Sequence, residues 1–130
     1  MNRRIAHITL VVKDYDEAIK FYAEKLDFKV VEDITLSESK RWVLISPTGS
    51  DECCLLLGKA VGAEQLSRVG NQTGGRVFLF LYTTDFWHDY YNMQSKGINF
   101  TREPVEEPYG TVAVFEDLYG NLWDLVEKRK

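Results

Sequence analysis

The sequence contains little cysteine, no run of basic residues and no long apolar run, and each of these absences excludes a class of protein. Its 2 cysteines are Cys53 and Cys54. Neighbouring cysteines cannot readily form an ordinary disulfide with each other, so we expect two reduced thiols in a strand. The alternating segment that follows Met1 to Arg4 is neither a signal-peptide core nor a membrane span. We therefore expect a cytoplasmic protein without a membrane partner.

The charge and the motifs of the chain exclude further classes. The net charge is −4 and no basic stretch occurs, which argues against nucleic acid as a partner. The chain also lacks a nucleophile–base arrangement, a phosphate-binding loop and zinc-finger spacing. Its 130 residues, 45% of them hydrophobic and 28% charged, are typical of one compact globular domain. The sequence therefore predicts a single domain over residues 1–130.

In the first half of the chain, the apolar pattern predicts a strand, a helix and three more strands. Asp14 precedes the helix and Glu17 follows three positions later, as a capping box requires. The apolar residues of the helix recur at spacings of three and four, which gives one buried stripe: Tyr15, Ala18, Ile19, Tyr22 and Leu26. The expected strands cover residues 5–12, 28–31, 41–46 and 53–57.

The second half of the chain repeats this order. Its expected strands cover residues 76–82, 98–101, 111–116 and 122–127, with a helix from Asp85 to Gly97. Three pairs of markers each lie 71 positions apart: His7 and Phe78, Asp14 and Asp85, Gly49 and Gly120. We therefore predict two βαβββ modules.

The two modules predict an α+β fold. Module one covers residues 1–58, a connector residues 59–74, and module two residues 75–130. A module of this kind curls its sheet around a concavity while its helix covers the outer face. Two of them are expected to make a cupped, barrel-like mixed sheet with a pocket.

Three motifs connect this arrangement to a known family. They are HITLVVKD at residues 7–14, AIKFY at residues 18–22 and DLYGNLWDL at residues 117–125. With the repeat, they resemble the vicinal oxygen chelate superfamily, also called the glyoxalase, bleomycin-resistance and extradiol-dioxygenase superfamily. The resemblance covers the chain except for the connector. It implies the fold, whereas members of the superfamily differ widely in function.

The resemblance also implies a site for a divalent metal ion at His7 and Asp124. The metal enzymes of this superfamily take ligands from the first and last strand of each module. Asp124 stands where the family most often has Glu, whereas Phe78 stands where His is common and cannot bind metal. The fourth position is one of residues 53–56. We therefore expect a weak, degenerate metal site, and a buried hydrogen-bonded pair of His7 and Asp124 is the alternative.

A stripe of aromatic residues predicts a ligand pocket. Phe78, Phe80 and Tyr82 alternate along one expected strand. By the repeat, they share the face that carries Thr9 in module one. Three rings on one face line an apolar pocket or fill a core, and both interpretations stay open.

The positions of three more aromatic residues in the pattern predict their roles. Tyr109 lies between two expected strands, where it either closes over a bound ligand or packs against its own hairpin. Trp42 and Trp123 are expected to be core residues beneath the helices.

Two functions are consistent with these features. The first is a small-molecule-binding protein of the bleomycin-resistance type, which needs no metal. The alternative is a divalent-metal-dependent lyase, isomerase or dioxygenase that acts on a small organic substrate with vicinal oxygens. In both cases the partner is a small organic molecule. We also expect a homodimer, because a second copy would cover an exposed sheet edge.

Overall fold

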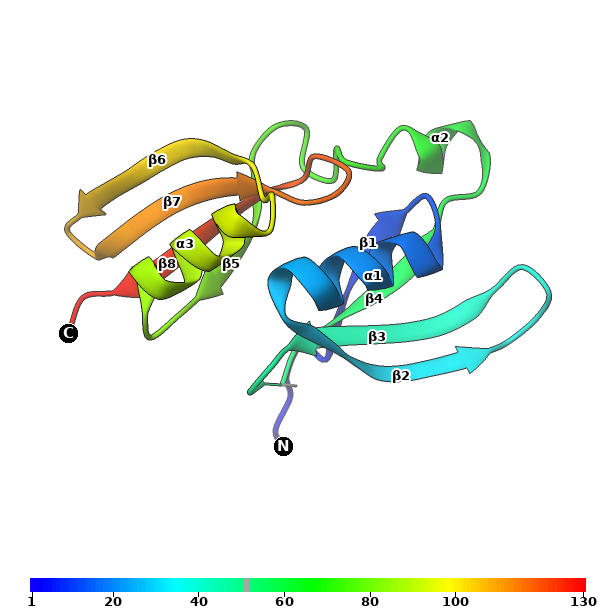
Figure 1. Ribbon diagram of the computed structural model, residues 1–130. Coiled ribbons are helices and arrows are strands. Elements are labelled where there is room, and N and C mark those ends of the chain that lie inside the picture. Colours follow the sequence, from blue (N-terminus) through cyan, green and yellow to red (C-terminus); the bar gives the residue numbers. More distant parts are fainter. Residues whose placement is uncertain (51) are drawn as a thin grey trace. The chain divides into compact units, whose positions relative to one another are not determined.

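The computed structural model describes residues 1–50 and 52–130. The chain divides into unit 1, Met1–Val69, and unit 2, Gly70–Lys130. Each unit contains one four-stranded mixed sheet with a helix on one face (Figure 1). This confirms the predicted α+β class and the two βαβββ modules. The boundary between the units falls inside the predicted connector.

In unit 1, a parallel pair of strands joins the start of the module to its end. The elements in chain order are β1 (His7–Val12), α1 (Tyr15–Leu26), β2 (Phe28–Thr35), β3 (Arg41–Pro47), β4 (Cys54–Lys59) and the short α2 (Gly62–Leu66). The strand order is β1-β4-β3-β2. β1 runs parallel to β4, and the other two pairs are antiparallel.

Helix α1 begins at the predicted cap. The Asp14 carboxylate accepts a hydrogen bond of 2.8 Å from the backbone N–H of Glu17. The helix ends at Asp27, which has a left-handed φ of 61°. Its stripe packs against one face of the sheet, which we call the helix face of unit 1. That face is formed by the buried residues Leu10, Val12, Val43, Ile45, Leu55 and Leu57.

Unit 2 repeats this topology. Its elements are β5 (Val77–Tyr82), α3 (Phe86–Ser95), β6 (Phe100–Glu107), β7 (Gly110–Glu116) and β8 (Leu122–Lys128). The strand order is β5-β8-β7-β6, and β5 runs parallel to β8. Among the described residues, no helix is long and apolar enough to cross a membrane.

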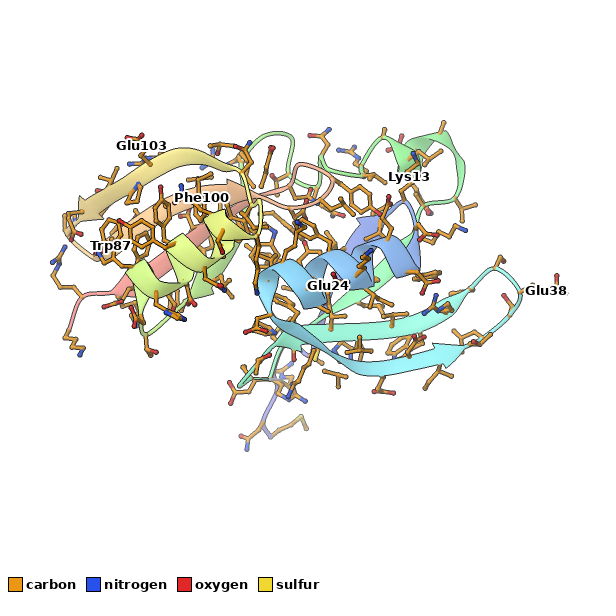
Figure 2. All side chains as sticks on the ribbon, viewed as in Figure 1. Lys13, Glu24, Glu38, Trp87, Phe100 and Glu103 are labelled. Carbon is orange, nitrogen blue, oxygen red and sulfur yellow. The ribbon has the colours of Figure 1, made fainter. Side chains whose placement is uncertain are left out.

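Aromatic rings fill the space between α3 and its sheet. Tyr90 of α3 contacts Phe100, with ring centroids 4.5 Å apart; Phe100 is labelled in Figure 2. Phe100 contacts Phe115, with ring centroids 5.7 Å apart. Phe115 in turn stacks on Trp123, with ring centroids 5.8 Å apart. Trp123 is buried, as expected from the sequence. These contacts identify the helix face of unit 2, which carries Leu79, Leu81, Phe100, Ala113, Phe115, Trp123 and Leu125.

A buried carboxylate closes the turn between β7 and β8. Asp117 accepts backbone hydrogen bonds from Tyr119, Gly120 and Asn121 at 2.9–3.1 Å. Its second oxygen accepts one from the Asn121 side chain at 3.0 Å. Gly70 packs against the same turn, because a Cβ atom there would lie 1.9 Å from the Tyr119 carbonyl oxygen. The start of unit 2 and its last turn are therefore one packed structure.

We expect Asp117→Ala to lower the free energy of unfolding by about 3 kcal/mol, because several buried donors lose a charged acceptor. Urea titration followed by circular dichroism measures the change. Glu38→Ala is the control, since Glu38 is exposed in the loop between β2 and β3 (Figure 2). A loss no larger for Asp117→Ala than for this control would contradict the structural role of the carboxylate.

Candidate functional site

The sheet of unit 2 has a second face, which its helix does not cover. Because paired residues point to the same side of a sheet, the strand register identifies its members. Phe80 pairs with Asp124, and Asp124 pairs with Val114 on its other side. We call this the helix-free face of unit 2, formed by Phe80, Tyr82, Arg102, Val112, Val114, Asp124 and Val126.

Two exposed rings stand on this face beside a buried apolar floor. Val112, Val114 and Val126 are buried, whereas Phe80 and Tyr82 are each 62% exposed. The ammonium group of Lys128 lies over the Tyr82 ring, 5.5 Å from its centroid. Exposed aromatic rings beside a buried apolar surface are a typical place for an organic ligand to bind.

The predicted three-ring stripe has an irregular start. The pairing of β5 with β8 shifts between Val77 and Leu79, which places Phe78 in a β-bulge. Phe80 and Tyr82 follow the regular alternation. Tyr109 is exposed in the turn between β6 and β7, where its carbonyl accepts a hydrogen bond of 2.9 Å from the backbone N–H of Arg129.

Asp124 is the acidic group of this face. Only 9% of the residue is exposed, and its side chain makes no hydrogen bond or ion pair with the described residues of unit 2. Burial raises the pKa of the Asp124 carboxyl above its ordinary value of 3.8, and the positive charge of Arg102 opposes that shift. Arg102 itself is bound to Glu107 at 3.1 Å. Asp124 is thus a buried acid whose nearest countercharge already has another partner.

Unit 1 also has a helix-free face, which carries His7, Thr9, Val11, Trp42, Leu44, Leu56 and Gly58. The His7 ring meets the Trp42 ring edge to face, with centroids 6.0 Å apart. Trp42 therefore lies on this face, and the expectation that it sits beneath a helix is wrong. The alternation of β3 explains the difference, because Trp42 shares the side of Leu44 and Leu56. Thr9 closely approaches Gly58, whose missing Cβ would lie 3.3 Å from the Thr9 methyl group.

A cavity of about 490 Å³ opens where this face meets the connector. Its lining includes Tyr15, Arg41, Trp42, Leu56, Gly58 and Gln65. The guanidinium of Arg41 is held by Asp16 at 2.8 Å and by Asp33 at 2.6 Å, and these two carboxylates raise its pKa. Since its charge is already balanced, Arg41 shapes the rim of the cavity and is not a free anion receptor. The cavity itself is mainly apolar and aromatic.

The register identifies the fourth family ligand position, which the sequence left open within residues 53–56. Thr9 pairs with Leu56 as Phe80 pairs with Asp124, so Leu56 is the counterpart of Asp124. Leucine cannot bind metal. Two of the four family positions, Leu56 and Phe78, therefore carry no donor atom.

Neither unit by itself offers a donor set that fits a divalent ion. Within each unit, the described residues contain no group of three or more His, Cys, Asp or Glu side chains placed to hold a metal. The neighbours of His7 on its face are Thr9, Trp42 and Leu56. Asp124 lies instead among Phe80, Val114 and the positive Arg102. The metal-ligand roles of His7 and Asp124 stay predictions.

Comparison with known proteins identifies the family. The family model of the Glyoxalase/Bleomycin resistance protein/Dioxygenase superfamily matches residues 4–125 of this chain. The chain therefore belongs to this superfamily, as its three motifs indicate.

Individual relatives match along almost the whole chain. An uncharacterized protein of Shewanella frigidimarina (strain NCIMB 400) is 60% identical over 128 residues, which cover 98% of this chain and 95% of that protein. Among solved structures, UcmS2 is 32% identical with a TM-score of 0.84, covering 97% of this chain and 98% of UcmS2. TnmS3, an antibiotic binding protein from Streptomyces sp. CB03234, is 25% identical with a TM-score of 0.78 and 98% coverage of both chains.

We expect Asp124→Asn to raise the free energy of unfolding at pH 7. Burial raises the pKa of Asp124 in the folded protein, so ionising this carboxyl destabilises the fold as the pH rises above the ordinary value of 3.8. The gain should shrink near about pH 3, where the carboxyl is largely protonated in the folded and the unfolded chain. Urea titrations at both pH values measure the difference. A less stable variant at pH 7 would contradict this account and favour the buried hydrogen-bonded pair.

Proposed function

We propose that this protein binds a small aromatic molecule on the helix-free face of unit 2 and needs no metal to do so. The observation that carries the proposal is the pair of exposed rings, Phe80 and Tyr82, beside the buried valines of unit 2. Because the rings of Phe80 and Tyr82 are not packed into the core, their surface is available to a ligand. The antibiotic-binding activity named for TnmS3 supports the same class of function.

We propose further contact residues in each unit, considered separately. In unit 1, Thr9 belongs to the helix-free face, near the cavity lined by Trp42 and Leu56. Phe78 starts the aromatic row of unit 2, and Tyr109 is exposed on the turn of a hairpin. We propose that each of these residues offers a ligand contact on its own unit and that the protein acts in the cytoplasm, where Cys53 and Cys54 stay reduced.

The metal-dependent lyase, isomerase or dioxygenase is the weaker candidate. It requires an ion at His7 and Asp124, which would polarise vicinal oxygens of the substrate. Phe78 and Leu56 supply no ligand at the remaining two family positions. Two protein ligands leave an ion mostly hydrated, so a metal bound here would be held weakly.

The binding proposal predicts a preference for aromatic over saturated ligands. We expect 1-naphthylmethanol to bind more tightly than its fully saturated decalin counterpart, because ring stacking contributes about 0.5–1.5 kcal/mol per pair beyond area burial. Phe80→Ala should weaken binding of the naphthalene compound more than that of the decalin compound. Titration calorimetry measures both ligands with both proteins.

Trp87→Ala is the matched control for this experiment. Trp87 is also an exposed aromatic residue, but it belongs to α3 and not to the helix-free face (Figure 2). We expect this variant to bind like the wild type. Equal losses for both ligands in Phe80→Ala would show that the ring only fills space.

We also propose that the protein is a homodimer. Strand β2 is an edge of its sheet, and this strand and the residue that follows it expose a group of apolar side chains: Val30, Val31, Ile34 and Leu36. Exposed apolar edges are commonly covered by another chain, and a second copy is the simplest partner. We expect sedimentation velocity at micromolar concentration to give the mass of a dimer, that is, twice 15.1 kDa. A sample sedimenting at the mass of one chain would contradict the proposal.

A further inference from the structure

We infer that the ligand carries a protonated amine beside its aromatic ring, and that Asp124 recognises this amine. The inference rests on the proposed function and adds the charge of the ligand to it. It assigns Asp124 a binding role that is independent of any metal.

The first reason is that Asp124 is buried without a partner. The residue is 9% exposed, and among the described residues of unit 2 its carboxylate has neither a hydrogen bond nor an ion pair. Its register neighbours, Phe80 and Val114, are apolar and cannot donate to it. The carboxylate oxygens are not fully enclosed, so a ligand can reach them, whereas the burial of the residue makes an unpaired negative charge there costly. An ammonium group supplies up to three donors and the opposite charge.

The second reason is the pattern of charges around this acid. Arg102 from β6 is close enough to act on Asp124, but its guanidinium is bound to Glu107 at 3.1 Å. Lys128 of β8 lies over the Tyr82 ring, and Glu116 of β7 accepts a hydrogen bond of 2.9 Å from Asn99. Each of these other charged groups therefore has a contact of its own, and the only ion pair among them is that of Arg102 with Glu107. Asp124 is the charged group of this face for which the described residues of unit 2 supply neither a hydrogen bond nor an ion pair.

The third reason is the position of the rings. Phe80 stands directly across from Asp124, and Tyr82 follows two residues later on the same side of β5. A ring can stack on the ligand's aromatic part or bind its ammonium group through the ring face. An acid next to exposed rings therefore suits an aromatic ammonium compound. An aromatic carboxylate would meet Asp124 as a like charge.

The test uses three ligands that share one ring system and differ in charge. These are 1-naphthylmethylamine, 1-naphthylmethanol and 1-naphthoic acid, titrated calorimetrically at pH 7. We expect wild-type protein to bind the amine about tenfold more tightly than the alcohol, which is the low end for a hydrogen bond to a charged group. The acid should bind most weakly. Asp124→Asn should abolish the preference for the amine, so that the variant binds the amine no more tightly than the alcohol.

Glu24→Gln is the control for the change in net charge. Glu24 is exposed on α1 of unit 1 and belongs to neither helix-free face (Figure 2). This variant loses the same charge as Asp124→Asn and should keep the tenfold preference. Circular dichroism of both variants verifies that they are folded.

The results separate this inference from the proposed function. Binding of the alcohol without a preference for the amine would overturn the inference alone, and so would a preference that survives in Asp124→Asn. Tighter binding of naphthoic acid would also overturn it, because Arg102 would then set the ligand's charge. If none of the three compounds binds, the proposed aromatic site is wrong as well.

Discussion

The pairing of the first and last strands of each unit is the constraint on which the rest of the structure depends. Because β5 runs parallel to β8 in a fixed register, Phe80 and Asp124 meet across adjacent strands. A shift of β8 by one residue would turn the acid toward Phe115 and bring Trp123 and Leu125 to the other face. The chemistry of the helix-free face and the packing of the helix face are therefore set together.

Each helix covers only one side of its sheet, and this division decides what the other side can do. In unit 2 the rings of Tyr90, Phe100, Phe115 and Trp123 form the core beneath α3. That core stabilises the sheet without using Phe80, Tyr82 or Asp124. The helix-free face can consequently hold a buried acid that costs folding free energy, because the stability of the unit comes from elsewhere. A group that destabilises the fold and has no internal partner is a reasonable place to look for function.

The sequence predicted most of the fold because the relevant signals are local. Asp14 and Asp85 both cap their helices as expected, and the repeat gave the order of the elements. The edge strands β2 and β6 are longer than predicted, since their residues are mostly exposed and carry little apolar periodicity. Site positions were harder, because they depend on register. The bulge at Phe78, the side of the sheet that Trp42 occupies and the equivalence of Leu56 with Asp124 all require the paired strands.

The two units differ in the connection before their last strand, and the difference has a consequence for how the sequence can diversify. In unit 2 the carboxylate of Asp117 closes a short turn between Glu116 and Leu122, with Gly70 packed against it. In unit 1 the corresponding connection runs from Pro47 to Cys54 and is longer. Insertions and deletions should therefore accumulate in the first connection and be purged from the second. A loop library grafted for new binding specificity belongs in unit 1, where the described residues of the connection contain no buried carboxylate like that of Asp117.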